Sequence, residues 1–255
     1  MLILGGTGEA RELATGLLAA GTQVLSSLAG RVSQPRLPDG PLRAGGFGGA
    51  EGLAAFLRDE GITHLIDATH PFADGITANA AVAASQAGVP RLVLRRPPWE
   101  SEPSWKVLPD IHATAEAVRA WPGEGVFLAT GRGELAAFAA DTRHWFLVRA
   151  IDRPAGATPP RMTLILDRGP YTAGQESALL REHRIGLLVT RNSGGAMTSA
   201  KLQAARELGV QVFMVGRPPL PPGSTVVATV PEALCWIARA GLAGTADRCA
   251  AAGPG

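Results

Sequence analysis

The stretch Leu2-Ile3-Leu4-Gly5-Gly6-Thr7-Gly8-Glu9 decides the expected fold, because a short apolar run passes directly into a glycine-rich turn. The residues that follow, 9–20, have the apolar spacing of an amphipathic helix. A strand, a glycine turn and a helix N-terminus together form an anion site, since the first N–H groups of the helix point at the ligand. We therefore expect a dinucleotide phosphate to be bound by Gly5, Gly6, Thr7, Gly8 and Glu9.

The glycine pattern of this turn is incomplete. Gly6 and Gly8 match the first two glycines of G-x-G-x-x-G, whereas Arg11 stands at the third position. Taken alone, the turn predicts a phosphate ligand of some kind, and a tight turn without a ligand stays the alternative.

The next predicted strand, residues 23–28, indicates which dinucleotide binds. Sites for NAD place Asp or Glu about 20 residues after the glycines, where it binds the ribose 2′-hydroxyl. No acidic residue lies between Leu13 and Pro38, and the strand is followed by Ala29-Gly30-Arg31. An arginine at this place suits a 2′-phosphate. We therefore predict that the cofactor is NADPH and that Gly30 and Arg31 contact it.

The rest of the chain alternates short apolar runs with Ala/Leu-rich helical stretches, which predicts an α/β fold with mainly parallel sheets. A second strand and glycine turn, FLATGRGEL, begins at Phe127 and resembles the first. We expect two Rossmann-like domains with an interdomain cleft. The predicted division is an NADPH-binding domain over 1–98, a Pro-rich linker over 99–109, a second Rossmann-like domain over 110–242 and a flexible tail over 243–255.

A second candidate segment, Asp67-Ala68-Thr69-His70-Pro71-Phe72-Ala73, follows another predicted strand. Its position at the carboxyl end of that strand predicts that it faces the nicotinamide. We take Asp67 and His70 as catalytic candidates, and Thr69, Pro71 and Phe72 as cofactor contacts. A histidine can donate a proton near neutral pH. The alternative is that His70 orients the loop through backbone hydrogen bonds.

Composition excludes several other classes of protein. The net charge of +2 argues against a nucleic-acid binder. The chain has no P-loop motif and no metal-ligand spacing, so we expect no kinase and no metal. No apolar run reaches the roughly 18–20 residues of a membrane span, and we see no signal peptide. We expect a cytoplasmic protein and a monomer.

Several motifs taken together resemble one family, the precorrin-6A and cobalt-precorrin-6A reductases of cobalamin biosynthesis. They occur in order over almost the whole chain: GGTGEAREL, SLAGR, DATHPFA, LRRPPW, RGPYTAGQE, TRNSGG and KLQAARELGVQVFMVGRP. The family pattern often has Lys where this chain has Arg191, which keeps the charge but changes its geometry. The resemblance implies that NADPH reduces precorrin-6A to precorrin-6B, with hydride going to C19 of the macrocycle.

The resemblance also gives the second domain a substrate. Precorrin-6A is a large tetrapyrrole with many carboxylate side chains, which arginine forks and backbone N–H groups can hold. The implied substrate-binding residues are Arg132, Arg168, Arg191, Asn192, Ser193, Gly194, Gly195 and Lys201. Two alternatives stay open at this point: another NADPH-dependent reductase with a smaller substrate, and a non-catalytic tetrapyrrole- or nucleotide-binding protein.

Overall fold

The computed structural model describes residues 1–30, 36–196 and 199–240. The chain forms two compact units: unit 1 contains Met1–Arg96 and the chain from Pro219 onward, and unit 2 contains Pro97–Pro218. Arg31, which was predicted to contact the cofactor, and the predicted tail over 243–255 lie outside the described residues.

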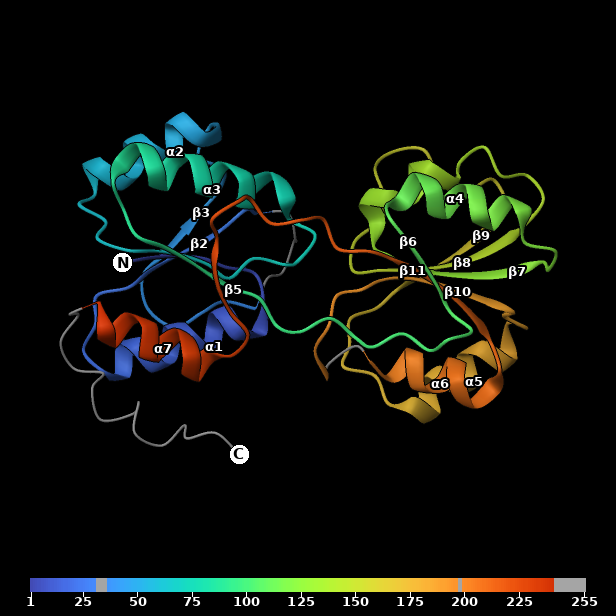
Figure 1. The fold of residues 1–255 in the computed structure, drawn as a ribbon. Coiled ribbons are helices and arrows are strands. Elements are labelled where there is room, and N and C mark those ends of the chain that lie inside the picture. The colour runs from blue at the N-terminus through green and yellow to red at the C-terminus, as the bar shows by residue number, and fades with distance from the viewer. Residues whose placement is uncertain (31–35, 197–198, 241–255) are drawn as a thin grey trace. The chain divides into compact units, whose positions relative to one another are not determined.

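Unit 1 is built on a six-stranded sheet in the order β12-β5-β4-β1-β2-β3, and each pair of neighbouring strands is parallel. The strands are β1 (Leu2–Leu4), β2 (Leu25–Leu28), β3 (Leu42–Ala44), β4 (Leu65–Asp67), β5 (Arg91–Leu94) and β12 (Thr225–Val227). The helices are α1 (Gly8–Ala19), α2 (Gly49–Asp59), α3 (Asp74–Ala87) and α7 (Val230–Arg239). The helices α1 and α7 cover one face and α2 and α3 the other (Figure 1).

The core of unit 1 has one apolar layer on each face of its sheet. Side chains of a strand alternate between faces, so Ile3 packs into the layer formed with α1 and α7, while Leu2 and Leu4 pack into the layer formed with α2 and α3. All three are at most 2% exposed. Burial on both faces explains why β1 is a continuous apolar run.

Unit 2 repeats this architecture with the strand order β6-β11-β10-β7-β8-β9, again parallel throughout. Its strands are β6 (Lys106–Leu108), β7 (Gly125–Ala129), β8 (Trp145–Ala150), β9 (Met162–Leu166), β10 (Leu187–Arg191) and β11 (Gln211–Val215). Its helices are α4 (Ile111–Ala120), the 3₁₀ helix η1 (Arg132–Phe138), α5 (Ala173–Glu182) and α6 (Ala200–Leu208). The predicted α/β class with parallel sheets is confirmed.

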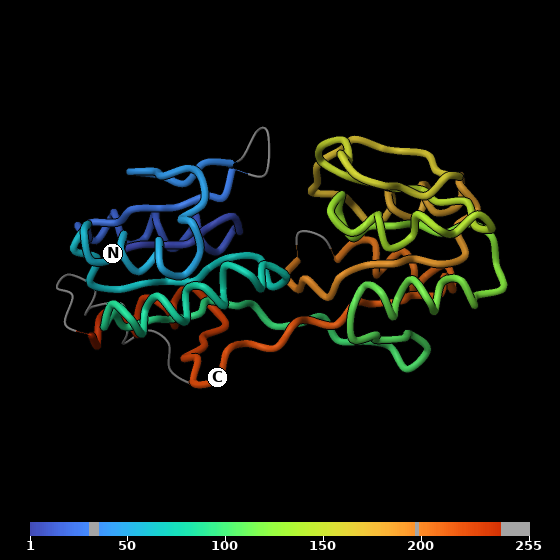
Figure 2. Tube along the Cα trace, turned by 90° about the horizontal axis from the view of Figure 1, so that it is seen from above, coloured from blue at the N-terminus to red at the C-terminus, as the bar shows by residue number. Residues whose placement is uncertain are grey.

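The predicted domain limits are wrong in two places. Residues 225–240 belong to unit 1, because β12 pairs with β5 and α7 packs against α1 (Figure 2). The predicted linker over 99–109 contains β6, which pairs with β11 at an edge of the second sheet. The chain therefore passes between the units twice, and the second passage has its own prolines at 218–222. The cleft expected between the domains stays a prediction.

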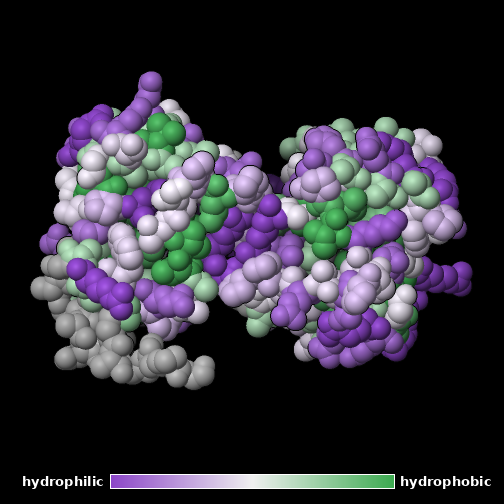
Figure 3. Space-filling model, in the orientation of Figure 1, coloured by the Kyte–Doolittle hydropathy of each residue, from purple (hydrophilic) through white to green (hydrophobic). Residues whose placement is uncertain are grey.

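No helix within the described ranges is long and apolar enough to span a membrane. On the face drawn in Figure 3, hydrophilic residues are interspersed with hydrophobic ones over both units.

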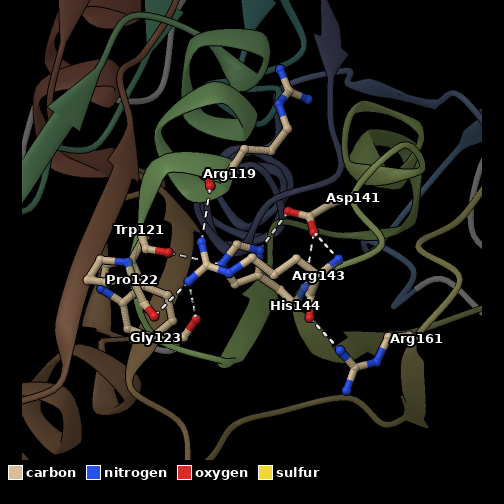
Figure 4. A network of polar contacts seen from close by, with 8 residues as sticks. All are labelled: Arg119, Trp121, Pro122, Gly123, Asp141, Arg143, His144 and Arg161. Atoms are coloured by element: carbon tan, nitrogen blue, oxygen red, sulfur yellow. Dashed lines mark hydrogen bonds and ion pairs between the residues drawn. The ribbon is translucent and has the colours of Figure 1, made fainter.

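A buried ion pair stabilises the amino-terminal edge of the second sheet (Figure 4). His144 is 0% exposed, and its Nδ1 lies 2.7 Å from Asp141 Oδ2 while its Nε2 lies 3.1 Å from the carbonyl of Trp121. Burial alone would raise the pKa of Asp141, but hydrogen bonds from His144 and Arg143 and the charge of His144 lower it overall.

We predict that Asp141→Asn lowers the free energy of unfolding by about 3–5 kcal/mol at pH 7, because it breaks a buried, hydrogen-bonded pair by removing the charge of one partner. The native-state pKa of Asp141 lies below the usual 3.8. Its stabilisation is therefore complete above that pH and is lost as the pH falls through the lower native value.

Urea unfolding of both proteins at pH 7 and at pH 3 measures this difference, which should shrink at the lower pH. Asp110→Asn is the matched control, because exposed Asp110 only caps α4 and asparagine caps equally well. A loss for Asp141→Asn no larger than for Asp110→Asn would contradict the prediction.

Candidate functional site

The glycine turn after β1 is held in place by the strands on either side of it. The N–H of Gly5 donates to the carbonyl of Ser27 at 2.9 Å. Thr7 Oγ1 donates to the carbonyl of Ala68 at 2.8 Å and accepts from the N–H of Ala10 at 3.1 Å, which caps α1. Since the Thr7 hydroxyl is used within the protein, a ligand at this turn would meet backbone groups.

Two glycines of the turn differ in what requires them. Gly6 has a φ of +119°, which favours glycine. Gly8 does not have a positive φ angle. A Cβ atom added to Gly8 would meet only the tip of the Arg11 side chain, with 3.8 Å between the Cβ and Arg11 Nη2. Within the described ranges, neither packing nor conformation requires glycine at this position. The space beside the first turn of α1 therefore fits a phosphate group.

An acidic side chain also lies in this first turn. Glu9 Oε2 is 2.9 Å from Arg96 Nη1, and both side chains are partly buried. A free carboxylate here would repel a phosphate, and the guanidinium offsets its charge. The structure thus pairs the Glu9 carboxylate within the protein and leaves the backbone of the turn for a ligand.

The segment after β4 meets the glycine turn at one edge of the sheet. Leu4 and Asp67 are paired residues of parallel strands, so the chain leaves both strands in the same direction. Asp67 is 2% exposed, and its Oδ1 accepts from the N–H and the hydroxyl of Thr69 at 3.1 and 2.7 Å. Its Oδ2 has no hydrogen-bond partner within the part of the chain that the structure describes.

Two arginines of β5 and its carboxyl end share the electrostatic field of Asp67. Burial lowers the pKa of Arg91 and of Arg95, and the charge of Asp67 opposes both shifts. Arg95 Nη2 donates to the carbonyl of Pro71 at 2.7 Å. The loop that contains Pro71 is therefore fixed from β4 by Asp67 and from β5 by Arg95.

His70 takes part in the internal structure of this loop. Its Nδ1 accepts from the N–H of Phe72 at 3.3 Å, and its carbonyl accepts from the N–H of Ala73 at 2.8 Å. The His70 and Phe72 rings are 5.9 Å apart and tilted by 40°. With Nδ1 as acceptor, the ring carries its proton on Nε2. These contacts favour the loop-orienting role of His70, and its role as an acid stays a prediction.

Gly30 follows β2 at the same edge of the sheet. It is exposed and has a φ of +69°, so this position favours glycine for its backbone conformation. The register between Leu4 and Ser27 places the end of β2 beside the glycine turn. The described candidates of unit 1 thus come together at the carboxyl ends of β1, β2 and β4.

In unit 2, the turn after β10 is occupied by contacts with the protein itself. Asn192 Oδ1 accepts from the N–H of Trp99 at 2.8 Å, and its Nδ2 donates to the carbonyl of Trp99 at 3.1 Å. A Cβ on Gly194 would lie 2.1 Å from the carbonyl oxygen of Pro97. Trp99 Nε1 donates to the carbonyl of Gly195 at 2.8 Å. These contacts hold the turn in place, and substrate contact through Asn192, Ser193, Gly194 and Gly195 stays a prediction.

Lys201 and Arg191 belong to a buried group of charged residues. Lys201 Nζ lies 4.7 Å from the centre of the Trp99 ring. Burial, followed by the charge of Arg149, lowers the pKa of Lys201 to about 7; Glu176 opposes the shift and Arg191 adds to it. Glu176 Oε1 pairs with Arg149 Nη2 at 2.7 Å. These charges come from β8, β10, α5 and α6, near the carboxyl edge of the sheet.

The other two arginine candidates of unit 2 are more accessible. Arg132 is exposed, with Nη1 3.5 Å from Asp152 Oδ2. Arg168 is partly buried, and its N–H donates to Asp167 Oδ1 at 2.7 Å.

Arg191 is paired with a carboxylate of η1, since its Nη1 lies 3.8 Å from Glu134 Oε1. Burial raises the pKa of Glu134, and the charge of Arg191 partly offsets this rise.

Comparison with known proteins shows the family of this chain. Residues 1–238 match the sequence profile of the family described as precorrin-6x reductase CbiJ/CobK. The chain belongs to the precorrin-6x reductase family.

Relatives in this family are similar to the chain over nearly its whole length. A precorrin-6A reductase from Rhodococcus erythropolis is 52% identical over 240 residues, which cover 93% of this chain and 96% of the relative. One from Mycobacterium tuberculosis is 51% identical, covering 93% and 97%. A solved structure of CobK precorrin-6A reductase superimposes with a TM-score of 0.87 at 40% identity, covering 95% of this chain and 97% of the other.

The structure adds residues to the two candidate sites that the motifs did not single out. Arg11 lies beside Gly8, and the described residues give its side chain no hydrogen bond or ion pair. Its signal in the sequence was its place at the third glycine of the fingerprint. Arg95 and Arg96 could have been found as two consecutive arginines after a predicted strand. The pairing of Arg149 with Glu176 could not be seen in the sequence, because 26 residues lie between them.

We predict that Lys201 makes the stability of the protein rise with pH. Between pH 7 and 10.5 the unfolded chain keeps a proton on this lysine that the native state has lost. The unfolded state thus binds more protons, so the free energy of unfolding increases over this window. Lys201→Met should remove that increase and should stabilise the protein more at pH 7 than at pH 9.

Denaturant unfolding of the wild type and the variant at pH 7 and pH 9 measures this effect. Lys106→Met is the matched control, because Lys106 is the other lysine of the chain and is exposed on β6. The same pH dependence in the wild type, Lys201→Met and Lys106→Met would refute a depressed pKa at Lys201.

Proposed function

We propose that this protein catalyses the NADPH-dependent reduction of precorrin-6A to precorrin-6B in cobalamin biosynthesis, with hydride delivered to C19 of the macrocycle. The observation that carries the proposal is the similarity to precorrin-6A reductases over 93% of the chain at up to 52% identity. The glycine turn of unit 1 and the buried cations of unit 2 are chemically suited to the two reactants.

The proposed NADPH site lies at the carboxyl edge of the sheet in unit 1. The turn Gly5–Glu9 would hold the pyrophosphate on backbone N–H groups, and the guanidinium of Arg11 lies close enough to Gly8 to share that charge. Gly30 and Arg31 would take the ribose and its 2′-phosphate. The Asp67–Phe72 segment, at the end of the neighbouring strand, would contact the nicotinamide through Thr69, Pro71 and Phe72.

The proposed substrate contacts lie in unit 2. A tetrapyrrole with many carboxylates calls for several cations, and Arg132, Arg168, Arg191 and Lys201 supply four. Arg191 and Lys201 are less exposed than Arg132, so water would screen their charge from an anion less. Ser193 and Gly195, in the turn after β10, would add polar backbone contacts.

In this reaction the bound nicotinamide supplies a hydride from its C4 atom, and a proton is added to the ring carbon next to C19. The protein would have to hold the reacting carbons within about 3–3.5 Å of each other and exclude water. Asp67 and His70 would hold the loop at the nicotinamide, Asp67 through Thr69 and His70 through Phe72. His70 Nε2, a water molecule and a substrate carboxylic acid stay the candidates for the proton donor. The cytoplasmic location and the monomeric state also stay predictions.

The direct test is to incubate the protein with precorrin-6A and NADPH. We expect the absorbance of the reduced nicotinamide to fall together with a change in the tetrapyrrole spectrum, one NADPH being consumed per molecule of precorrin-6B. Binding of both compounds without turnover would instead indicate a non-catalytic protein. Turnover of a small ketone but not of precorrin-6A would indicate another reductase.

The choice of cofactor is tested at Arg31. Arg31→Ala should raise the KM for NADPH by about 10- to 100-fold, the usual value of a charge-assisted phosphate contact of 1.5–3 kcal/mol. The KM for NADH should stay nearly unchanged, because NADH has no 2′-phosphate. Arg36→Ala, five residues further on, is the control. Equal effects of Arg31→Ala on both cofactors would refute the assignment.

A further inference from the structure

Two consecutive arginines at the end of β5 each bind one of the two turns that form the proposed cofactor site. Arg96 pairs with Glu9 of the glycine turn, Nη1 to Oε2, at 2.9 Å. Arg95 donates from Nη2 to the carbonyl of Pro71, in the segment after β4, at 2.7 Å. We propose that Arg95 and Arg96 are positioning residues that set the distance between the phosphate-binding turn and the nicotinamide-binding loop of NADPH.

The position of these arginines is fixed by the sheet. β5 pairs with β4 on one side, Val93 opposite Asp67, and with β12 on the other, Leu94 opposite Val227. The N–H of Arg95 donates to the carbonyl of Val227 at 2.9 Å, which extends the pairing with β12 by one residue. The backbone from which both side chains extend is therefore held on two sides.

The contacts suit a positioning role because each fixes a group on which the cofactor geometry depends. Arg96 draws the Glu9 carboxylate to itself and offsets a negative charge at the helix N-terminus, where a phosphate would bind. Arg95 holds the carbonyl of buried Pro71, between His70 and Phe72. The charge of Asp67, the carboxylate that binds Thr69, also acts on Arg95.

The inference rests on the proposed function, since the distance between the turns matters only if one dinucleotide spans both. It predicts different effects of the two arginines. Loss of the Arg96 contact frees the Glu9 charge beside the phosphates and should mainly weaken NADPH binding. Loss of the Arg95 contact lets the loop shift at the reacting end and should mainly lower kcat.

The test compares Arg95→Gln, Arg96→Gln, Glu9→Gln and the double variant Glu9→Gln/Arg96→Gln. Arg91→Gln is the matched control: Arg91 is partly buried on the same strand and also near Asp67, but it donates to Ser224 instead of to either turn. The measurements are the Kd of NADPH by fluorescence titration, kcat and KM with precorrin-6A, and Tm for each variant.

We expect Arg96→Gln to raise the Kd of NADPH by about 10-fold, and Arg95→Gln to lower kcat by about 10- to 100-fold, as displaced reacting groups do. The KM for precorrin-6A should stay within about twofold, a difference near 0.4 kcal/mol. The double variant should bind NADPH better than Arg96→Gln alone, because it removes the unpaired Glu9 charge. If the two arginines only stabilised the fold, every variant would have a lower Tm, and Arg96→Gln would not act mainly on the Kd of NADPH while Arg95→Gln acts mainly on kcat.

Effects of Arg95→Gln and Arg96→Gln on Kd and kcat no larger than that of Arg91→Gln would overturn the positioning role. The same holds if Glu9→Gln brings no recovery of NADPH binding to Arg96→Gln. A wild type that binds NADPH but does not reduce precorrin-6A would refute the proposed function, and the Kd values would still test the positioning of the glycine turn. A wild type without NADPH binding would overturn both proposals.

Discussion

Parallel pairing of β1 with β2 on one side and β4 on the other is the constraint on which the cofactor site of unit 1 depends. In a parallel sheet all carboxyl ends lie at one edge, so the segments that follow these strands must meet there. The glycine turn, Gly30 and the Asp67–Phe72 loop are up to 67 positions apart in sequence, from Gly5 to Phe72, and become neighbours for this reason alone. The hydrogen bond from Thr7 to the carbonyl of Ala68 closes the contact.

The two units apply the same topology to different electrostatic tasks. In unit 1, the Glu9 carboxylate near the candidate site is paired with Arg96, and the charge of Asp67 acts on Arg91 and Arg95 without a direct ion pair among the described residues. In unit 2, Arg149 lies with Glu176 and Arg191 with Glu134, and Lys201 is buried near Arg149, Arg191 and Glu176. A binding partner rich in carboxylates would add negative charge beside these cations.

The features that could be predicted from the sequence are local ones. The strand, turn and helix around Gly5–Glu9 and the parallel α/β class follow from apolar runs and glycines that stand side by side in the chain. The edge strands β3 and β6 could not be predicted. Each has only three residues, and some of their side chains, such as Leu42 and Val107, are exposed, so neither strand shows a periodic apolar pattern. The return of β12 to unit 1 depends on its pairing with β5. Leu92 of β5 lies opposite Thr225 of β12, which is 133 positions further along the chain. The hydrogen bond between Asn192 and Trp99 could not be predicted for the same reason, because the two residues are far apart in sequence.

Transfer of the hydride itself is the most direct test of the central claim, that this protein reduces precorrin-6A with NADPH bound in unit 1. The measurement uses NADPH with deuterium at both C4 positions of the nicotinamide, and locates the label in the tetrapyrrole product by NMR and mass spectrometry. We expect one deuterium per molecule, at C19, and a solvent-derived proton on the neighbouring carbon. A product without deuterium, or a C19 hydrogen that comes from water, would contradict it.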